Sequence, residues 1–464
     1  MDRGGAAMSR NFDAIIVGAG QAGPPLAGRL TATGMRIALV ERKLFGGTCV
    51  NTGCIPTKTL VASARTAHLA RRAADFGVKI PIAIGVDMQA VKARKDAIST
   101  KSREGVEAWL RSMDGCTVIK GHARFESPRE MRVGDELIAA DRIFLNVGGR
   151  ALVPEMPGID RVTTLTNTTI LALDILPRHL AVVGGGYVGL EFAQMYRRFG
   201  SEVTVIEQSS RLCQREDEDV SAAITDILER EGITIRLDAE CIGFHPAGTE
   251  IAVNVNCTTG APEVLASHVL LAIGRRPNTD DLALPAAGVA TNLRGYIEVD
   301  DQLRTNVPGI WALGDCNGRG AFTHTAYNDF EIVAANLLDH EPRRLSDRIL
   351  GYALYIDPPL GRVGMTEHEA RHAGRKIRIG MRPMTRVGRA IEKGETQGFM
   401  KVIVDSETKQ ILGASILGVG GDEAIHGIMD TMYAKAPYTT LQRSVPIHPT
   451  VSELIPTMLG GLTP

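Results

Sequence analysis

The pattern of apolar positions predicts two units in which a short buried strand is followed by a glycine-rich turn and a helix. Residues 12–17 (FDAIIV) form an apolar run that fits a buried parallel strand, and a second run covers 36–40. The same arrangement returns at 179–183 and 202–206. Uninterrupted apolar runs of this length are typical of parallel sheets whose two faces are covered. The pattern therefore predicts two α/β units of related design.

A glycine-rich turn follows the first strand of each unit. Residues 18–23 (GAGQAG) and 184–189 (GGGYVG) both match Gly-x-Gly-x-x-Gly, which allows a tight turn and close approach of a pyrophosphate to a helix start. The second strand of each unit ends in an acid, Glu41 or Glu207, 23 positions after the first glycine and suited to accept ribose hydroxyls. The glycines concerned are Gly18, Gly20, Gly23, Gly184, Gly186 and Gly189. Two complete fingerprints predict two dinucleotide sites.

From about residue 346 the pattern changes. Short β-like runs over 399–404 and 410–417 are separated by turn signals and followed by a helix around 422–433, without a glycine fingerprint. This segment predicts an α+β domain. A chain of 464 residues is too long for one core, and its length is that of about three domains.

Composition excludes several kinds of partner. With 52 basic and 53 acidic residues, the chain offers no general attraction for nucleic acid or an anionic membrane, so we expect small-molecule partners. No apolar run reaches the ~20 residues that span a bilayer. The first eight residues lack the apolar centre of a signal peptide, and residues 1–11 are expected to be a disordered leader. We expect a cytoplasmic protein.

The cysteine pattern points to redox chemistry. The seven cysteines are odd in number and mostly isolated, which argues against a structural disulfide framework. Within 46–58 (GGTCVNTGCIPTK), Cys49 and Cys54 would lie ~9 Å apart on a straight helix, too far for a disulfide, so the segment must loop if the sulfurs are to meet. Gly53 supplies backbone freedom, and a helix is predicted over 57–74. A thiolate at a helix start has a pKa below ~8.5. On spacing alone, two buried structural cysteines are an equally good interpretation.

Residues 46–58 as a whole resemble the redox-disulfide signature of the flavin-dependent pyridine nucleotide-disulfide oxidoreductases, which include dihydrolipoamide dehydrogenase, glutathione reductase and mercuric reductase. Residues 305–315 (TNVPGIWALGD) resemble the second FAD motif of that family, and 271–278 (LAIGRRPN) its exit from the NAD domain. Residues 447–453 (IHPTVSE) resemble its C-terminal His-Pro-Thr-x-x-Glu motif. The resemblance covers nearly all of the chain after residue 11.

The resemblance implies an α/β fold with two Rossmann-like dinucleotide-binding domains, for FAD and NAD(P), plus a C-terminal α+β dimerisation domain. The implied divisions are a leader (1–11), the first part of the FAD domain (12–155), the NAD(P) domain (156–278), the second part of the FAD domain (279–345) and the interface domain (346–464). It also implies a homodimer that shares its active site.

The resemblance assigns roles to the catalytic residues. Cys54 would be the thiolate next to the flavin and Cys49 the thiol that attacks substrate. His448 of the other subunit would take and return the proton, which suits an imidazole with a pKa near ~6.5. Glu453 would orient that ring, and Lys58 would lie near the flavin.

The cofactor contacts follow from the same resemblance. For FAD they are Gly18, Gly20, Gly23, Glu41, Gly47, Thr48, Lys58, Gly148, Gly314 and Asp315. For NAD(P) they are Gly184, Gly186, Tyr187, Gly189, Glu191, Glu207 and Gly274. Asp315 would bind the ribityl chain and Glu191 would pair with Lys58, while Tyr187 would cover the nicotinamide pocket or serve as packing. No resident metal site is predicted.

Glu207 bears on the nicotinamide cofactor. A carboxylate there accepts hydrogen bonds from a ribose diol and repels a 2′-phosphate, so NADH is favoured. Arg211 is close enough in sequence to keep NADPH open.

The substrate stays open among several disulfide or metal reductases. The familiar mercuric reductases carry an extra C-terminal cysteine pair, whereas this chain has no cysteine after Cys316, which disfavours mercury reduction by that route. Segments 21–24, 56–60 and 322–325 nevertheless resemble the mercuric-reductase-like, reactive-chlorine-resistance branch. Glutathione reductase is disfavoured because its substrate-binding arginine has no counterpart at Gly28.

Dihydrolipoamide dehydrogenase fits the complete catalytic set, although Pro446 replaces a histidine of its typical members. Two further classes remain. A flavin NADH oxidase, diaphorase or transhydrogenase would not use the cysteines, and a flavoprotein scaffold would show negligible turnover. The physiological electron acceptor and the direction of the reaction are left open.

Overall fold

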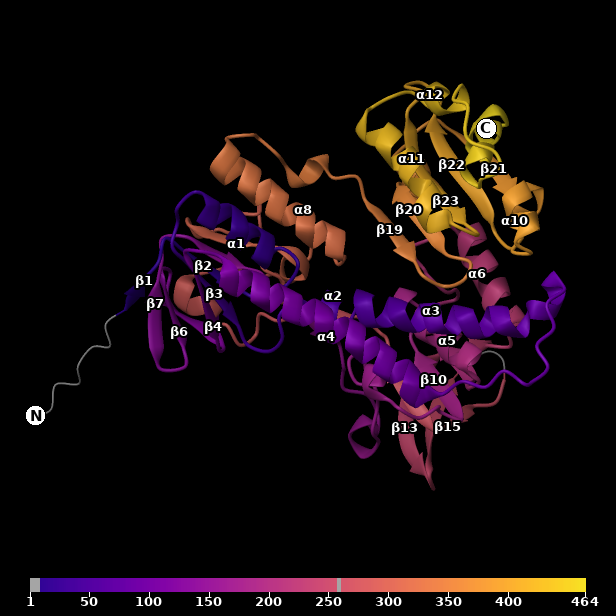
Figure 1. The fold of residues 1–464 in the computed structure, drawn as a ribbon, viewed down its shortest axis with the longest axis horizontal. Helices are drawn as coiled ribbons and strands as arrows, with labels where there is room; N and C mark the ends of the chain where they lie inside the picture. Colours follow the sequence, from indigo (N-terminus) through magenta and orange to yellow (C-terminus); the bar gives the residue numbers. More distant parts are fainter. Residues whose placement is uncertain (1–8, 257–259) are drawn as a thin grey trace, which may run out of the picture. The chain divides into compact units, whose positions relative to one another are not determined.

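The computed structural model describes residues 9–256 and 260–464 and divides into two compact units. The first unit runs up to Thr59 and includes Lys92–Leu152 and Gly274–Arg348. The second includes Leu60–Val91, Val153–Ile273 and Ile349–Pro464. Figure 1 shows the elements of both units by label. Among the described residues, no helix has the length and apolar character needed to cross a membrane.

A five-stranded parallel sheet forms the centre of the first unit. Its order is β18 (Ile310–Ala312), β8 (Ile143–Leu145), β2 (Ala14–Val17), β3 (Ile37–Glu41) and β4 (Cys116–Lys120). Strand β2 lies in the middle and is wholly buried, which explains its uninterrupted apolar sequence. The two strands predicted here are confirmed, although β2 begins two residues later than the apolar run.

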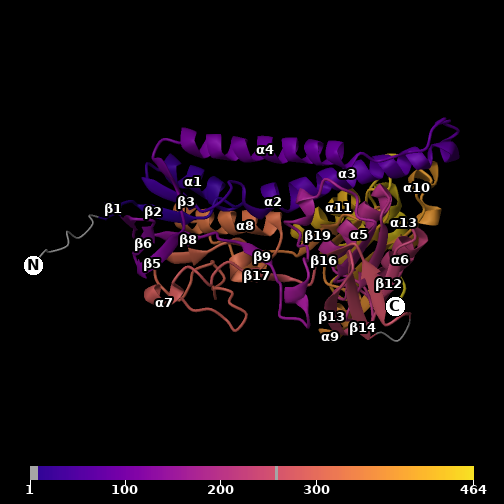
Figure 2. The ribbon, with the colours of Figure 1, turned by 90° about the horizontal axis from the view of Figure 1, so that it is seen from below.

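Helices cover one face of this sheet. Leu26 and Leu30 of α1 (Gly23–Ala32) and Leu110 of α4 (Met88–Ser112) share a buried cluster with Ile16. The C-terminal part of α4 runs beside α1 (Figure 2), where Trp109 lies against Gly28. The opposite face packs on a second sheet, because Ile15 belongs to a cluster with side chains of β5 and β6.

The second sheet of the first unit has the order β1 (Arg10–Asn11), β7 (Glu136–Ala139), β6 (Glu130–Val133) and β5 (Ala123–Ser127). Arg10 and Asn11 pair with Ile138 and Ala139, so the last two residues of the predicted leader belong to a strand. Residues 1–8 of that leader lie outside the described residues. The remaining elements are β9 (Gly149–Ala151), β17 (Arg275–Pro277), α2 (Gly47–Asn51), α7 (Leu284–Ala287), η4 (Gly314–Asn317), α8 (Thr323–Ala334), η5 (Ala335–Asp339) and η6 (Leu345–Asp347). Helix α3 (Cys54–Arg71), like α4, contributes residues to both units.

The second unit contains a parallel sheet of the same kind. Its order is β12 (Thr234–Arg236), β11 (Glu202–Ile206), β10 (His179–Val183) and β16 (His268–Leu271). The predicted strands 179–183 and 202–206 coincide with β10 and β11 residue for residue. Helices α5 (Tyr187–Phe199) and α6 (Glu218–Arg230) follow β10 and β11, and an antiparallel sheet adds β13 (Glu240–Ala247), β14 (Glu250–Asn256) and β15 (Glu263–Ala266). Short 3-10 turns are η1 (Ala73–Phe76), η2 (Ile159–Arg161) and η3 (Ile170–Ala172).

The C-terminal part of the second unit is an antiparallel sheet with helices. Its order is β19 (Gly351–Leu354), β20 (Leu360–Gly364), β23 (Ile411–Leu417), β22 (Phe399–Asp405) and β21 (Ile377–Pro383). Its helical elements are α9 (Glu367–His372), η7 (Met384–Arg386), α10 (Gly388–Glu392), α11 (Gly421–Tyr433), α12 (Thr439–Gln442), η8 (Ser452–Leu454) and α13 (Ile455–Gly460). Ile425 and Ile428 of α11 pack on Val363 and Ala414 of the sheet. The predicted strands and helix of this region are confirmed, as is the fold class.

Candidate functional site

The cysteine segment folds as two helices with a break between them. Cys49 lies in α2 and Cys54 is the first residue of α3, so the predicted loop is the two-residue interruption at Thr52 and Gly53. A Cβ on Gly53 would approach the Thr48 carbonyl oxygen to 2.9 Å. Close packing, rather than a left-handed backbone angle, therefore requires this glycine. Helix α3 ends at Arg71, three residues before the predicted end.

The two cysteines are free thiols in contact with one hydroxyl. Cys49 is half-buried and Cys54 is exposed. A hydrogen bond with Cys54, together with burial, raises the pKa of the Cys49 thiol, and a hydrogen bond with Thr323 opposes that rise. The Cys54 Sγ lies 3.2 Å from Thr323 Oγ1. In the sequence, Thr323 lies in segment 322–325, which resembles the reactive-chlorine-resistance branch of the family, but nothing in that segment predicted a contact with the cysteines.

The cysteine segment is anchored on the first glycine turn. Gly46 and Gly47 have φ angles of 89° and 63°, in the left-handed region that glycine tolerates. The Gly46 N–H donates to Ala19 O at 2.8 Å, and a Cβ on Gly47 would lie 2.8 Å from the Gly20 Cα. The backbone of the cysteine segment thus lies directly against the turn that is predicted to bind the FAD pyrophosphate.

The acids of the two fingerprints have the same hydrogen bonds. Glu41 accepts the Ala19 N–H at 2.9 Å on one oxygen and the Lys43 N–H at 2.7 Å on the other. Glu207 accepts the Gly185 and Ser209 N–H groups at 2.6 and 2.8 Å. Each carboxylate is therefore fixed beside its glycine turn, where the sequence fingerprint predicts a ribose.

Asn146 is a buried residue under the first glycine turn that the sequence reasoning missed. A Cβ on Gly18 would lie 2.3 Å from its carbonyl oxygen, and one on Gly20 would lie 3.2 Å from its amide nitrogen. The neighbouring Gly148 has a φ of 64° and accepts the Asn278 N–H at 3.0 Å.

Residues 274–278 of the predicted exit from the NAD domain and the second FAD motif also lie in the first unit. Gly274 has a φ of 131°, and β17, which follows it, pairs with β9. Gly314 has a φ of 74° and donates its N–H to Asp329 at 2.7 Å, which fixes the start of the turn that carries Asp315. Burial raises the pKa of the Asp315 carboxyl, and Arg275, 3.5 Å away, opposes this rise.

These residues fit a bound dinucleotide such as FAD. Residues 18–22 form a glycine-rich turn directly before α1, and this turn rather than the helix start would face a pyrophosphate, because Pro24 and Pro25 in the first turn of α1 have no N–H. Glu41 supplies a fixed acceptor and Asp315 a second acid. Both belong to the same unit as the cysteine pair.

His448 and Glu453 form a pair in the second unit. The His448 Nδ1 lies 2.8 Å from a Glu453 carboxylate oxygen, and the imidazole is 82% exposed while the carboxylate is 15% exposed. The carboxylate therefore fixes one ring nitrogen and leaves Nε2 for another partner. This is the orientation that the sequence motif predicts.

Three predicted residues occupy less decisive positions. Lys58 is half-buried on α3 in the first unit, whereas Glu191 is buried on α5 in the second and accepts the Tyr355 N–H at 3.0 Å. Their pairing stays a prediction. Tyr187 is the first residue of α5, and its hydroxyl donates to Glu216, a second residue that the sequence reasoning missed.

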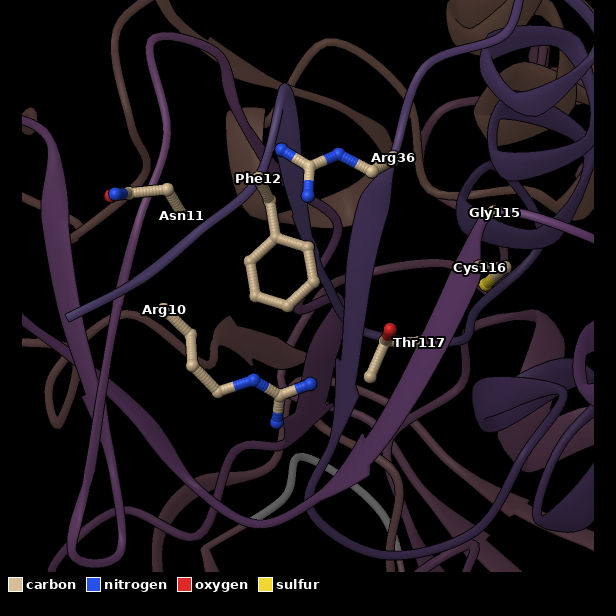
Figure 3. A pocket seen from close by; sticks show the side chains of 7 residues that line it. All are labelled: Arg10, Asn11, Phe12, Arg36, Gly115, Cys116 and Thr117. Carbon is tan, nitrogen blue, oxygen red and sulfur yellow. The ribbon is translucent and has the colours of Figure 1, made fainter. Parts of the chain in front are cut away.

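A recess of about 440 Å³ lies elsewhere in the first unit (Figure 3). It is lined by Arg10, Asn11, Phe12, Arg36, Gly115, Cys116 and Thr117. These residues belong to β1 and to the amino ends of β2, β3 and β4, whereas the first glycine turn follows the carboxyl end of β2. The recess is therefore separate from the predicted FAD site.

Comparisons with known proteins agree with this geometry. The chain is 37% identical over 452 residues to a probable pyridine nucleotide-disulfide oxidoreductase, RclA, of Escherichia coli, covering 95% of this chain and 97% of the relative. It is 32% identical to a dihydrolipoyl dehydrogenase of Thermus scotoductus over 96% of each chain. The solved Cu(II) complex of the HOCl-induced flavoprotein disulfide reductase RclA from Escherichia coli matches with a TM-score of 0.89 at 35% identity, over 98% of this chain and 99% of that one.

Family models account for most of the chain. Residues 12–329 match the pyridine nucleotide-disulphide oxidoreductase model, and residues 351–459 match the dimerisation domain of the same family. The chain therefore belongs to the pyridine nucleotide-disulphide oxidoreductases, which are FAD-dependent enzymes that pass electrons between a nicotinamide nucleotide and a disulfide.

Proposed function

We propose that this enzyme uses NADH to reduce a small disulfide through Cys49 and Cys54. The observation that carries the proposal is the contact of these two thiols at the start of α3, on a segment anchored to the first glycine turn. FAD, when bound, supplies the two-electron carrier between the nicotinamide and the cysteine pair. Gly18, Gly20, Gly23, Gly47, Thr48, Gly148 and Gly314, with Glu41, Lys58 and Asp315, would hold it.

The reduced cysteine pair performs the exchange with substrate. The Cys49 thiolate attacks one sulfur of the substrate disulfide and displaces the other as a thiolate. The Cys54 thiolate then attacks the Cys49 sulfur, which releases the second substrate thiol and leaves a Cys49–Cys54 disulfide. The contact between the two thiols supports this order, because the second attack needs no large movement.

The proton balance falls to a histidine. The partner's His448 takes the proton from Cys49 and gives it to the first leaving thiolate, because an imidazole can both accept and donate a proton near neutral pH. The Glu453 carboxylate holds one ring nitrogen at 2.8 Å and stabilises the charged form. The high exposure of His448 in the isolated chain, and the match of 351–459 to a dimerisation domain, support a homodimer with a shared site. We place the enzyme in the cytoplasm, where such a thiol pair can be kept reduced.

NADH is the proposed nucleotide. The Glu207 carboxylate is fixed beside the second glycine turn and would oppose a 2′-phosphate. Arg211 forms an ion pair with Glu218 at 3.2 Å and donates to Gln214 O. These contacts compete with any pairing of Arg211 with a 2′-phosphate. Gly184, Gly186, Tyr187, Gly189, Glu191 and Gly274 complete the proposed nucleotide contacts.

A second candidate is the reduction of Cu(II) by the same thiol pair. It is favoured by the similarity to a structure described as a Cu(II) complex of a flavoprotein disulfide reductase. Two Cu(II) ions would each take one electron, converting the dithiol to the disulfide with release of two protons. Within residues 9–256 and 260–464, no cluster of three or more His, Cys, Asp or Glu side chains is arranged to hold a metal, so the ion would be a substrate at the thiols.

Anaerobic titration of the purified holoenzyme with NADH, and separately with NADPH, tests the proposal. A long-wavelength absorbance band at two electrons that is absent in Cys54→Ser would establish coupling of the thiols to the flavin. Turnover with dihydrolipoamide, small disulfides and Cu(II) would then identify the acceptor. Bleaching of the flavin without that band, with full oxidase or transhydrogenase activity in Cys54→Ser, would refute the disulfide mechanism. No reduction by either nucleotide would favour a scaffold role.

A further inference from the structure

Glu216 is a buried carboxylate outside the predicted site. Its side chain is 0% exposed and lies in the loop between β11 and α6. One carboxylate oxygen accepts hydrogen bonds from the hydroxyls of Tyr187 and Tyr352, the latter at 2.7 Å. The other oxygen lies 3.5 Å from the Arg362 guanidinium, which is itself only 2% exposed. Four side chains thus form one buried polar cluster.

This cluster joins the second glycine turn to the C-terminal sheet. Tyr187 belongs to the turn, whereas Tyr352 and Arg362 face each other across β19 and β20. The tyrosine rings are in contact, with centroids 5.3 Å apart. The loop that carries Glu216 is also held to the turn, because the Cys213 N–H donates to Gly185 O at 3.0 Å.

The cluster is costly for a purely structural feature. Burying a carboxylate and a guanidinium loses hydration that their attraction only partly restores, and an apolar replacement of similar volume is often as stable. Within the described part of the chain, one Glu216 oxygen and one Arg362 nitrogen have no hydrogen-bond partner. Burial raises the pKa of both Tyr187 and Tyr352, so both hydroxyls stay protonated as donors. Such a cluster defines one position for the side chains that it holds.

We propose that Glu216 is a positioning residue for hydride transfer: it accepts the Tyr187 hydroxyl directly and is itself held by Tyr352 and Arg362 of the C-terminal domain. The inference rests on the proposed place of Tyr187 at the nicotinamide pocket. A ring whose hydroxyl is anchored is already ordered before the nucleotide binds, whereas a released ring samples several rotamers and must be ordered on binding. The C-terminal domain therefore takes part in nicotinamide binding as well as in dimerisation.

Stopped-flow reduction of the holoenzyme flavin by NADH tests this role. Tyr187→Phe keeps the ring and removes only the hydroxyl, and it should lower the rate constant of flavin reduction divided by the NADH dissociation constant about tenfold, as loss of one hydrogen bond to a charged group implies. Glu216→Gln should act in the same direction. The double variant should be no slower than the slower single variant, because both changes break one linkage.

Two controls separate positioning from a general loss of structure. Tyr196→Phe removes the hydroxyl of a buried tyrosine on the same helix, which donates to Ile170 O, and should reduce at the native rate. Reduction of the flavin by dithiothreitol enters through the cysteines and should be unchanged in Tyr187→Phe. If Glu216→Gln fails to fold, Tyr352→Phe replaces it and should give a smaller decrease in the same direction.

The outcomes distinguish this inference from the proposed function. Native enzyme that is rapidly reduced by NADH, with Tyr187→Phe and Glu216→Gln equally fast, overturns the inference alone. If the variants reduce their flavin more slowly with NADH and with dithiothreitol to the same extent, the inference is also overturned, because that pattern indicates a general loss of structure. Native enzyme that neither nucleotide reduces overturns both the proposed function and the inference.

Discussion

Replacing Thr323 with valine should raise the pKa of the Cys54 thiol. Thr323 is the first residue of α8, and its hydroxyl lies 3.2 Å from the Cys54 sulfur. Once Cys54 is a thiolate it can only accept, so the hydroxyl must be the donor. A donor stabilises the charged form and lowers the pKa, and its removal acts in the opposite direction.

The size of the change follows from this one contact. A hydrogen bond to a charged group contributes about 1.5–3 kcal/mol, and one pKa unit corresponds to about 1.4 kcal/mol. Because Cys54 is exposed, water replaces part of the lost hydrogen bond, and the lower end of the range applies. Valine should therefore raise the pKa by about one unit, which reduces the thiolate fraction about tenfold at pH values below it.

The rate of iodoacetamide alkylation at Cys54 against pH measures this pKa without any contribution from turnover. The measurement is made on the reduced protein in a Cys49→Ser background, because the two thiols share a hydrogen bond and would titrate together. Thr323→Ser keeps the hydroxyl and is the matched control, so it should titrate like the parent. An unchanged pKa in Thr323→Val, or an equal rise in Thr323→Ser, would refute the reasoning.

Four further results test other parts of the molecule. His448→Gln should lower turnover with a disulfide by about 10²- to 10⁴-fold while anaerobic reduction of the flavin by NADH stays native; equal loss in both assays would contradict a role in proton transfer. Glu207→Ala should lower the preference for NADH over NADPH about tenfold in kcat/KM, and an unchanged ratio would contradict its role. Lys401 is 2% exposed among three carboxylates, so Lys401→Met should lower the free energy of unfolding by about 3 kcal/mol, measured by denaturant titration. Burial raises the pKa of Asp217, but two backbone N–H groups and Lys401 lower it overall. The free energy of unfolding should therefore decrease as the pH is lowered below about 4, where Asp217 is protonated. The decrease, measured by denaturant titration at each pH, should be smaller in Lys401→Met.

The sequence predicted the buried centres of the strands better than their ends. Strands β10 and β11 coincide with their predicted runs, although their first residues, His179 and Glu202, are not buried. Phe12 and Asp13 continue the apolar run before β2, but they precede the strand, because the local pattern does not show where pairing begins. Helix α3 ends earlier than predicted because a 3-10 turn takes up the next residues, and the composition there does not distinguish the two.

The site was predictable where one short segment carries its chemistry and not where distant segments meet. Cys49 and Cys54 were identified from thirteen adjacent residues, and the contact between His448 and Glu453 needs only five positions of separation. Thr323 lies 269 positions from Cys54, and nothing in its local sequence points to a thiol.

Glu216 shows the same limit in another form. It lies two residues before a helix whose first residues are acidic, so its sequence neighbourhood is that of a solvent-exposed helix start. Only the tertiary fold buries it against Tyr352 and Arg362, 136 and 146 positions away. The two glycine fingerprints predict nucleotide sites from the sequence, whereas the proposed positioning of Tyr187 depends on residues of the C-terminal sheet that no local pattern indicates.

The two glycine fingerprints repeat one backbone arrangement at the two proposed nucleotide sites. Glu41 and Glu207 each accept one N–H from the turn and one from two residues beyond the acid, so the carboxylates are fixed before any nucleotide binds. The turn and its acid therefore cannot distinguish FAD from NADH, because both present an adenosine ribose. The distinction must come from what each turn is attached to: the first lies against the cysteine segment through Gly47, and the second is joined through Tyr187 and Glu216 to the C-terminal sheet. Loss of either attachment, the Gly47 contact or the Tyr187–Glu216 hydrogen bond, would leave the turn and its acid in place to bind a ribose. We expect nucleotide binding to persist and electron transfer to be lost.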